Sequence, residues 1–569
     1  MDKRYLKNTA ILFASMTITK IVGALFKIPL ANLLGGTGMG YFSAAYGLYS
    51  PIFALTAAGI PSVMMRVTAR NIAAGRPANA LKTRRTAMLL FSAAGLVGTL
   101  IVALFAPFFA EHIACSPEST PAVIAIAPAV MLCCIASVIR GYHEGMSDVL
   151  PSAAAAVAEA VSRAVFGLAM AYGIIFYAKY RAENGLDLFG RSYSSYDEAY
   201  RAVLPVAAAA AVLAVSISEL CGLLSLIISD RRRKSQPLPS SGQTDRMRTI
   251  AVRLIKEIIP VAASALVMNC VSFVDLVTVP RTLKSTMLSD SAFFAGRFSQ
   301  VLPVCGGIDG LANFMYGSYT GIAMTVFMLI PSFAGMTEKT ALPEIAAAWE
   351  RKDINAASES CRKLFRAAAV IGFPACAGAI ALGEPLLSTL YSSRAAEVSV
   401  CCTPFAVLCT GGFFMIIASA MFGVFQVIGK AHIPLILMTA SLGIKAALNP
   451  LLMSVPQLNI AGAAISTAIS YFFMAAVGSV LLKKHLSAKF SVFSCVKAPL
   501  ACSLLCGAAA FAVYSFVLKG SEALLSIAIS VFSGAFVYGL SLIINSYFRG
   551  NLQLMKFPEK KSQKHLKNP

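Results

Sequence analysis

Two lysines, Lys20 and Lys27, lie within an apolar segment, TITKIVGALFKIPLANLLGG (residues 17–36), that is long enough to cross a membrane. At the centre of a bilayer each lysine costs about 2.5–3.5 kcal/mol on insertion scales, so the pair costs roughly 5–7 kcal/mol. Seven residues make almost two helical turns, and both ammonium groups therefore share one face of the predicted helix. We expect that face to line a polar cavity; the alternatives are contact with lipid headgroups or a buried ion pair.

Other predicted spans carry acids as well as bases. Glu159 and Arg163 have acid-before-base i,i+4 spacing, which suits either a self-neutralising structural pair or part of a site. Asp275 is a single acid in a predicted span, with Arg281 just beyond the outer end of that span. An acid within the membrane is by default a cation or proton site, or a partner for one of the lysines.

Four further residues complete the candidate set. Lys445 and Asn449 are four residues apart in GIKAALNP, in the middle of a predicted helix. Arg66 and Arg140 end the second and fourth predicted spans, where an anchor under the positive-inside rule is the alternative to a role in binding. The candidate substrate-binding residues are Lys20, Lys27, Arg66, Arg140, Glu159, Arg163, Asp275, Arg281, Lys445 and Asn449.

The charges inside the spans predict an anionic substrate. With Glu159 and Arg163 set aside as a pair, Lys20, Lys27 and Lys445 remain against Asp275. Lysines serve as point charges for phosphate. A substrate of charge about −2 gains roughly 4.6 kcal/mol per 100 mV on leaving a negative cytoplasm, so the membrane potential alone could drive its export.

The elements that must position these residues are apolar segments that recur along all 569 residues. The chain is 57% hydrophobic and 13% charged, whereas soluble proteins have about a quarter charged residues, so we predict an all-α polytopic membrane protein. Fourteen spans are predicted, at about 8–34, 41–65, 86–109, 122–140, 149–178, 202–229, 258–279, 313–336, 367–387, 398–424, 432–455, 459–482, 494–518 and 521–546.

The basic residues set the predicted orientation. With both termini cytoplasmic, the basic loops all fall on one side of the membrane, as the positive-inside rule requires. These loops are 66–85, 231–256, 337–366, 483–497 and the tail 547–569. The net charge of +22 is therefore assigned to cytoplasmic loops and not to nucleic-acid binding.

The two halves of the chain resemble each other. RGYHEGMSDVLP (140–151) is echoed by GVFQVIGKAHIP (423–434), and residues 58–80 parallel residues 334–356. Six predicted spans separate the copies, so the halves share one orientation, an arrangement that suits alternating access. We expect a six-helix lobe at 1–230, a basic cytoplasmic linker at 231–257, a second six-helix lobe at 258–484, two additional spans within 485–546 and a basic tail at 547–569.

Several sequence features point away from enzyme chemistry. The sequence has no phosphate-binding loop, no HExxH and no GxSxG, so we expect no catalytic residue, metal or cofactor. We interpret GGTGMG (35–40) as a tight external turn and most of the 14 cysteines as buried apolar residues. Residues 341–366, which include Trp349, are predicted to form an amphipathic helix on anionic headgroups.

Long stretches of the chain resemble a known family. They are residues 18–66, 140–163, 259–283 and 442–471, and they resemble the polysaccharide-biosynthesis branch of the multidrug/oligosaccharidyl-lipid/polysaccharide (MOP) exporter superfamily, in the group of the lipid II flippases. The resemblance implies two six-helix lobes plus two helices in a bacterial plasma membrane, and export of undecaprenyl-pyrophosphate-linked sugars. The resemblance places the basic positions of the family's first helix on Lys20 and Lys27. It places the acid and the base of the fifth helix on Glu159 and Arg163, and the acid of the seventh helix on Asp275.

The sequence therefore favours a lipid-linked oligosaccharide flippase, with the peptidoglycan precursor ahead of other polyprenyl-linked sugars. Its expected partners are that substrate, membrane lipids and a coupling monovalent cation or proton. The main alternative is a multidrug antiporter of the same superfamily, which should have an acidic cavity for cations. The sequence also leaves open a membrane glycosyltransferase with acids in the loop 180–200, and a scaffold without transport activity.

Overall fold

The computed structural model describes residues 3–54, 59–191, 193, 195–233, 244–486, 490–517 and 523–548. These residues form helices, and an isolated bridge between Leu188 and Arg191 is the one extended pairing among them. The predicted all-α class is confirmed. Two parts of the predicted organisation lie outside the described residues: residues 234–243 of the basic linker, and the tail from residue 549.

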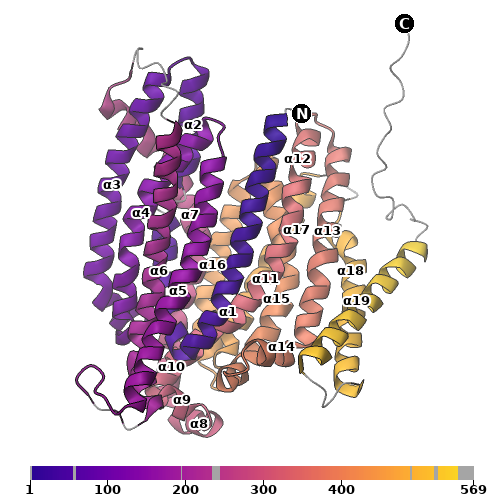
Figure 1. Cartoon of the computed structure of the whole chain (residues 1–569). Helices are drawn as coiled ribbons and strands as arrows, with labels where there is room; N and C mark the ends of the chain where they lie inside the picture. Colours follow the sequence, from indigo (N-terminus) through magenta and orange to yellow (C-terminus); the bar gives the residue numbers. More distant parts are fainter. Residues whose placement is uncertain are drawn as a thin grey trace.

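Each predicted span overlaps one or more helices, and several helices extend well beyond the predicted bounds (Figure 1). Their bounds are α1 Lys3–Phe53, α2 Gly59–Ala73, α3 Pro77–Phe108, α4 Thr120–Gly145, α5 Leu150–Glu183, α6 Tyr196–Arg233, α7 Met247–Ser289, α8 Ser291–Arg297, α9 Leu302–Cys305, α10 Ile308–Ser318, α11 Met324–Ala334, α12 Met336–Glu350, α13 Ile354–Ala381, α14 Gly383–Leu390, α15 Ala395–Val427, α16 His432–Met453, α17 Ala461–Lys483, α18 Val492–Ala512 and α19 Ala523–Phe548. The π-helical turns η2 (Phe109–Ile113), η4 (Tyr319–Ala323) and η5 (Val513–Val517) extend α3, link α10 to α11 and extend α18, and η3 (Pro117–Ser119) precedes α4.

Helix α1 is a hairpin of two antiparallel arms, residues 3–34 and 36–53. Gly35 interrupts the helix with φ 62° and ψ −173°, a backbone conformation that glycine adopts without a steric penalty. The rings of Phe26 and Phe42 lie 6.5 Å apart, whereas sixteen residues of straight helix would separate them by about 24 Å. The chain therefore reverses at Gly35, which confirms a tight turn within GGTGMG.

The number of membrane spans depends on how this hairpin is counted. By length and composition, twelve of the described helices can cross a membrane, or up to thirteen when α7, bent by 47° near residue 268, counts as one span. That count takes α1 once, although its chain reverses at Gly35. The predicted total of fourteen, and the orientation of the termini, stay predictions.

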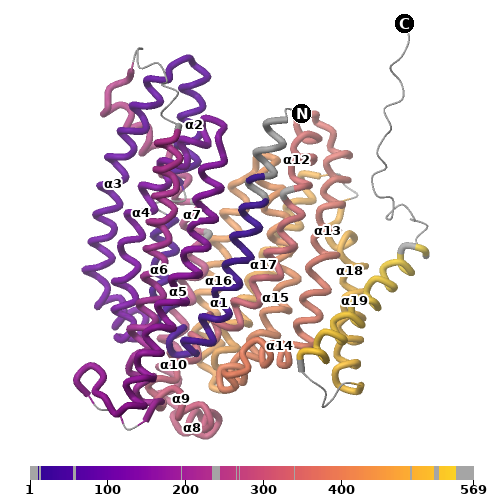
Figure 2. Tube along the Cα trace, viewed as in Figure 1, coloured from indigo at the N-terminus to yellow at the C-terminus, as the bar shows by residue number. Residues whose placement is uncertain are grey.

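The helices of each half of the chain pack mainly with one another. Helices α3, α4, α5 and α6 form one group, and α13, α15, α17 and α18 form another, with α19 against α18. Figures 1 and 2 show α3–α6 on the left, α13, α18 and α19 on the right, and the first arm of α1 crossing the space between them. The division into two six-helix lobes remains a prediction, and both α1 and α7 contact helices of each half.

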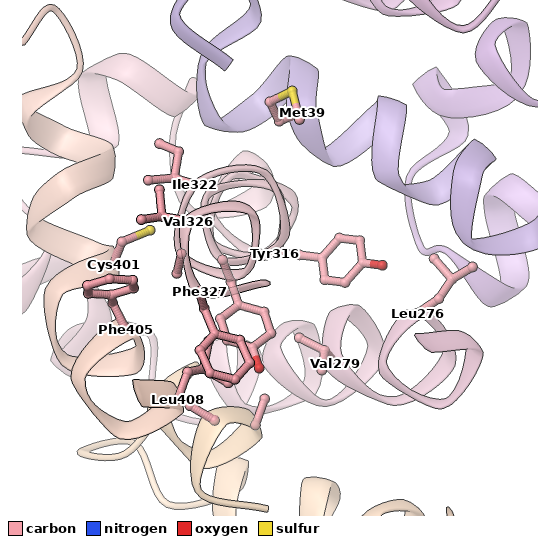
Figure 3. Packing of buried hydrophobic residues seen from close by; sticks show 14 of the residues in the cluster. Met39, Leu276, Val279, Tyr316, Ile322, Val326, Phe327, Cys401, Phe405 and Leu408 are labelled. Carbon is pink, nitrogen blue, oxygen red and sulfur yellow. The ribbon is translucent and has the colours of Figure 1, made fainter. Parts of the chain in front are cut away.

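A continuous apolar core fixes the long helix made of α10, η4 and α11 in the centre of the molecule. Figure 3 shows Tyr316 and Phe327 from this helix between Leu276 of α7 and Phe405 of α15. Phe327, Leu276 and Phe405 are fully buried. The central helix is therefore a rigid wall against which α1 packs.

The helix predicted at 341–366 is not continuous, and its contact with headgroups stays a prediction. The chain breaks at residues 351–353, and α12 folds back on α13, where Ser360 Oγ donates a hydrogen bond to Glu344 Oε1 at 2.8 Å. Trp349 packs against the core cluster and is only half-exposed. The apolar residues of this segment contact neighbouring helices, so their spacing reflects helix packing.

Candidate functional site

A cavity of about 620 Å³ lies between the two arms of α1 and the central helix. Both arms, together with α5, α7, α10, η4, α11 and α12, contribute to its wall. Its charged lining residues are Lys20, Lys27, Arg163 and Asp275. Four of the ten candidate residues therefore meet in one cavity, although they come from three separate helices.

The two lysines share the cavity-facing side of the first arm, as their spacing predicts. Lys20 is exposed, and its Nζ approaches the backbone oxygen of Ser332 on α11 at 3.4 Å. Lys27 is half-buried deeper in the cavity. In the described part of the chain no ion pair joins Lys27 to a carboxylate, whereas other buried cations at this depth have acidic partners.

Arg163 does not pair with Glu159, so the expected i,i+4 pair is wrong. Arg163 Nε donates to Ser218 Oγ at 3.2 Å, and Arg163 Nη2 lies 3.5 Å from Glu219 Oε1. Glu159 instead accepts a hydrogen bond from Arg140 of α4. An i,i+4 pair contributes only about 0.2–0.5 kcal/mol, and the packing of α4 and α6 against α5 provides buried partners for both side chains.

Asp275 is bound by two side chains of α16. Lys445 Nζ donates to Asp275 Oδ2 at 2.7 Å, and Asn449 Nδ2 donates to Asp275 Oδ1 at 3.0 Å. Asn449 also donates to Thr278 Oγ1 and accepts from Ser466 Oγ. Of the two interpretations open for this acid, the structure shows the ion pair with a lysine, and Lys445 does not contribute free charge to the cavity.

The cavity is nevertheless in a positive environment. The cations in and behind its wall are Lys20, Lys27, Arg140, Arg163 and Lys445, and the described carboxylates among them are Glu159, Glu219 and Asp275. Lys27, on the first arm of α1, supplies positive charge that no ion pair among the described residues neutralises. Arg66 and Arg281, by contrast, are exposed and do not line the cavity, so the structure separates them from the other candidates.

The tip of the α1 hairpin lies beyond the Lys27 end of the cavity and is held by charged side chains next to α15. Arg394, just before α15, donates from Nε and Nη2 to the Asn32 carbonyl oxygen at 2.9 and 2.7 Å, and from Nη2 to the Leu33 oxygen at 3.0 Å. Glu397 Oε1 accepts the Gly36 backbone N–H at 3.0 Å. A cation therefore caps the C-terminus of the first arm and an anion caps the N-terminus of the second.

Backbone contact seals the same end. A Cβ at Gly317 of α10 would overlap the Gly36 carbonyl oxygen and the Gly40 amide, so the two helices touch through their main chains. Asn313 Nδ2 also donates to the Thr37 carbonyl oxygen at 3.0 Å. The glycines at 36, 40 and 317 thus permit the close approach that shuts this end of the cavity.

The remaining sites that the sequence raised are structural. In the part of the chain that the structure describes, no group of three or more His, Cys, Asp or Glu side chains could hold a metal ion. The cysteines are free and most of them are buried, as expected for small apolar residues. Glu219, Arg394 and Glu397 were not among the candidates, although Glu219 carries the same signal as Asp275, an acid in the middle of an apolar span.

Two family models match the chain. The model of polysaccharide biosynthesis proteins matches residues 5–180, and that of the lipid II flippase MurJ matches residues 312–557. Among curated proteins, the chain is 23% identical over 555 residues to stage V sporulation protein B of Bacillus subtilis (95% of each chain), and 20% identical over 511 residues to lipid II flippase MurJ of the same organism (86% of this chain and 85% of MurJ).

Solved structures share the fold. A lipid II flippase MurJ in an inward closed conformation superposes with a TM-score of 0.67 at 12% identity, covering 96% of this chain and 100% of MurJ. An inward-facing multidrug resistance transporter of the MATE family superposes with a TM-score of 0.61 at 15% identity, covering 84% of this chain and 98% of the transporter. With its array of membrane-spanning helices, the chain is a multi-pass bacterial membrane protein that resembles the polysaccharide-biosynthesis and lipid-flippase branch of the MOP exporter superfamily.

Proposed function

We propose that the protein flips a polyprenyl-pyrophosphate-linked saccharide, with lipid II as the first candidate, from the inner to the outer leaflet by alternating access. The observation that carries this proposal is the pair Lys20 and Lys27 on one wall of the cavity, with Arg163 in the same lining. A diphosphate diester carries two negative charges, which matches the excess of positive charge. The curated relatives support the substrate class, because the names of two of them concern lipid II or sporulation.

The wall facing the lysines suits the lipid part of such a molecule. Met324, Met328 and Met336 line the cavity from α11 and α12, and Phe333 lies among them. Methionine and phenylalanine present adaptable apolar surface. One side of the cavity can therefore hold phosphate while the other contacts the first units of an isoprenoid chain.

Closure at the hairpin tip supports alternating access. The end at Gly35 is sealed by Arg394, Glu397 and Gly317, whereas Lys20, toward the other end, is exposed. With the predicted cytoplasmic termini, the sealed end faces outward and the cavity is accessible from the cytoplasm. The anionic substrate would enter from the inner leaflet and leave when the tip opens.

The membrane potential is the proposed driving force. A charge of −2 that moves outward gains roughly 4.6 kcal/mol per 100 mV. We assign no cation to Asp275, because the ammonium group of Lys445 already occupies that carboxylate at 2.7 Å. The likeness to MATE transporters favours the alternative function, a multidrug antiporter. Such an antiporter would need an available acid for a cationic drug. The ion pair of Asp275 with Lys445 opposes that alternative.

The test is translocation of lipid II in proteoliposomes with an imposed potential. Lys20→Met/Lys27→Met should reduce protein-dependent flipping by about 100-fold or more, because each charged hydrogen bond to phosphate contributes about 1.5–3 kcal/mol. Lys256→Met/Lys363→Met removes the same charge from exposed positions outside the cavity and should leave flipping unchanged.

Three outcomes decide between the two functions. Flipping lost only in the cavity variant supports the proposal. Flipping that neither variant reduces would mean that the phosphate binds outside this cavity. Absence of flipping at any potential, together with export of cationic dyes, would favour the antiporter.

A further inference from the structure

Four charged side chains meet behind the cavity wall, between α4, α5 and α6. Arg163 of α5 lines the cavity and has 27% of its side chain exposed, whereas its partner Glu219 on α6 has 7% exposed and lies behind it. Arg140 of α4 binds Glu159, the residue one turn before Arg163. Two arginines and two carboxylates therefore balance each other in a buried cluster, and one of the arginines faces the cavity.

The two carboxylates are close neighbours. Gly222 lies three residues after Glu219 on α6, and a Cβ at Gly222 would overlap the Glu159 carboxylate. Glu159 thus lies over α6 beside Glu219. Two buried carboxylates that lie side by side stay ionised together only while both arginines remain near them.

Arg163 can bind a ligand from the cavity side. Its Nε bonds to Ser218 and its Nη2 lies 3.5 Å from Glu219, a long distance for a charged pair, while Nη1 has no hydrogen-bond partner among the described residues. A phosphate in the cavity would draw the guanidinium forward. Glu219 and Glu159 would then share Arg140 alone, and a buried carboxylate without a counter-ion takes up a proton.

We propose that Glu219 is the replaceable counter-ion of Arg163: the phosphate of the substrate takes its place at the guanidinium, and Glu219 binds one proton from the water of the cavity. This inference rests on the proposed function and adds a proton that the protein binds together with the substrate. The charged and titratable groups that face Glu219 are Arg163 and Glu159 of α5, Arg140 and Cys133 of α4, and Tyr49 of α1, and Tyr46 of α1 lies near Arg163.

The experiment measures proton uptake on ligand binding to the full-length protein in detergent. The probe is geranyl-diphosphate-linked N-acetylglucosamine, a diphosphate diester whose own charge does not change near neutral pH. Calorimetric titration in buffers of different ionisation enthalpy gives the number of protons taken up per bound probe. We expect close to one proton for the native protein, with binding up to tenfold tighter for each unit of decrease in pH.

Two variants separate Glu219 from other groups. Glu219→Gln should bind the probe without proton uptake and with an affinity that no longer depends on pH. Glu198→Gln removes an exposed carboxylate from the same helix and should behave like the native protein. If Glu219→Gln does not fold, the infrared difference spectrum of the native protein on probe binding should still show a new band of a protonated carboxyl group.

Each result has one meaning. Proton uptake that is lost in Glu219→Gln, or the new carboxyl band, supports the proposal. Binding without proton uptake, or uptake that persists in Glu219→Gln, overturns it and leaves the proposed function intact. Absence of probe binding to the native protein overturns both.

Discussion

Replacement of Arg394 by alanine should open the sealed end of the cavity. The guanidinium of Arg394 donates to the carbonyl oxygens of Asn32 and Leu33 and to the hydroxyl group of Tyr200 at 2.8 Å, with 17% of the side chain exposed. A hydrogen bond from a charged donor contributes about 1.5–3 kcal/mol. Two such contacts at the lower value give about 3 kcal/mol for the closed state, since the side chain is solvated when the tip separates from α15.

A loss of about 3 kcal/mol should raise the open fraction roughly 100-fold, because 1.4 kcal/mol corresponds to a factor of ten. The assay introduces Ser272→Cys, an exposed position in the cavity wall, and follows its reaction with an impermeant thiol reagent added to the outside of cells. The background from native cysteines is measured in the protein with Ser272 unchanged. The labelling rate is proportional to the open fraction, so it should rise by the same factor in Arg394→Ala.

The matched control is Arg297→Ala, which removes an exposed arginine from α8 and should not change the rate. The thermal stability of each variant in detergent shows whether it remains folded. An unchanged labelling rate in a folded Arg394→Ala protein would refute the assignment of the hairpin tip as the closing contact. Faster labelling in both variants would show a general loosening of this end.

Two further predictions rest on backbone contact and on charge burial. Gly317→Ala in the Ser272→Cys background should also speed external labelling. The new Cβ would overlap the Gly36 carbonyl oxygen, and overpacking costs about 1–3 kcal/mol. Equal labelling rates would mean that α10 and the hairpin tip do not need to touch. Lys445→Met should lower the free energy of unfolding by about 3–5 kcal/mol, because it leaves Asp275 buried without its cation, and Asp275→Asn/Lys445→Met should recover most of the loss. Denaturation in detergent measures both stability changes, and a double variant as unstable as the single one would contradict the ion-pair explanation.

Much of the architecture could be predicted from the sequence because the bilayer restricts it. A chain in lipid must satisfy its backbone within helices, so long apolar segments indicate where the helices lie, although several helices extend well beyond the apolar segment. The face shared by Lys20 and Lys27 follows from helix geometry alone, and both side chains do line the cavity. The reversal at Gly35 was also predictable, because the glycine-rich segment interrupts an apolar run.

The partners of the buried charges could not be predicted in the same way. Local spacing suggested that Glu159 pairs with Arg163. In the folded chain, other helices provide the partners: Arg140 for Glu159 and Glu219 for Arg163. A single sequence contains no direct information on which helix faces which. Arg394 and Glu397 were missed for a related reason: charges in a short connection are typical of solvated loops, and only the position of the hairpin tip shows that they bind backbone groups.

The first arm of α1 connects the proposed substrate site to the seal. Lys27 and Asn32 are five residues apart, about 7.5 Å along one helix, so a force on the lysine side chain acts on the carbonyl that Arg394 holds. The arm packs against the central helix and ends at Gly35, where the backbone leaves the helical conformation. A phosphate that draws Lys20 and Lys27 into the cavity therefore competes with the caps at the tip. Substrate binding and opening of the far end would then be two consequences of one displacement, which is the coupling that alternating access requires.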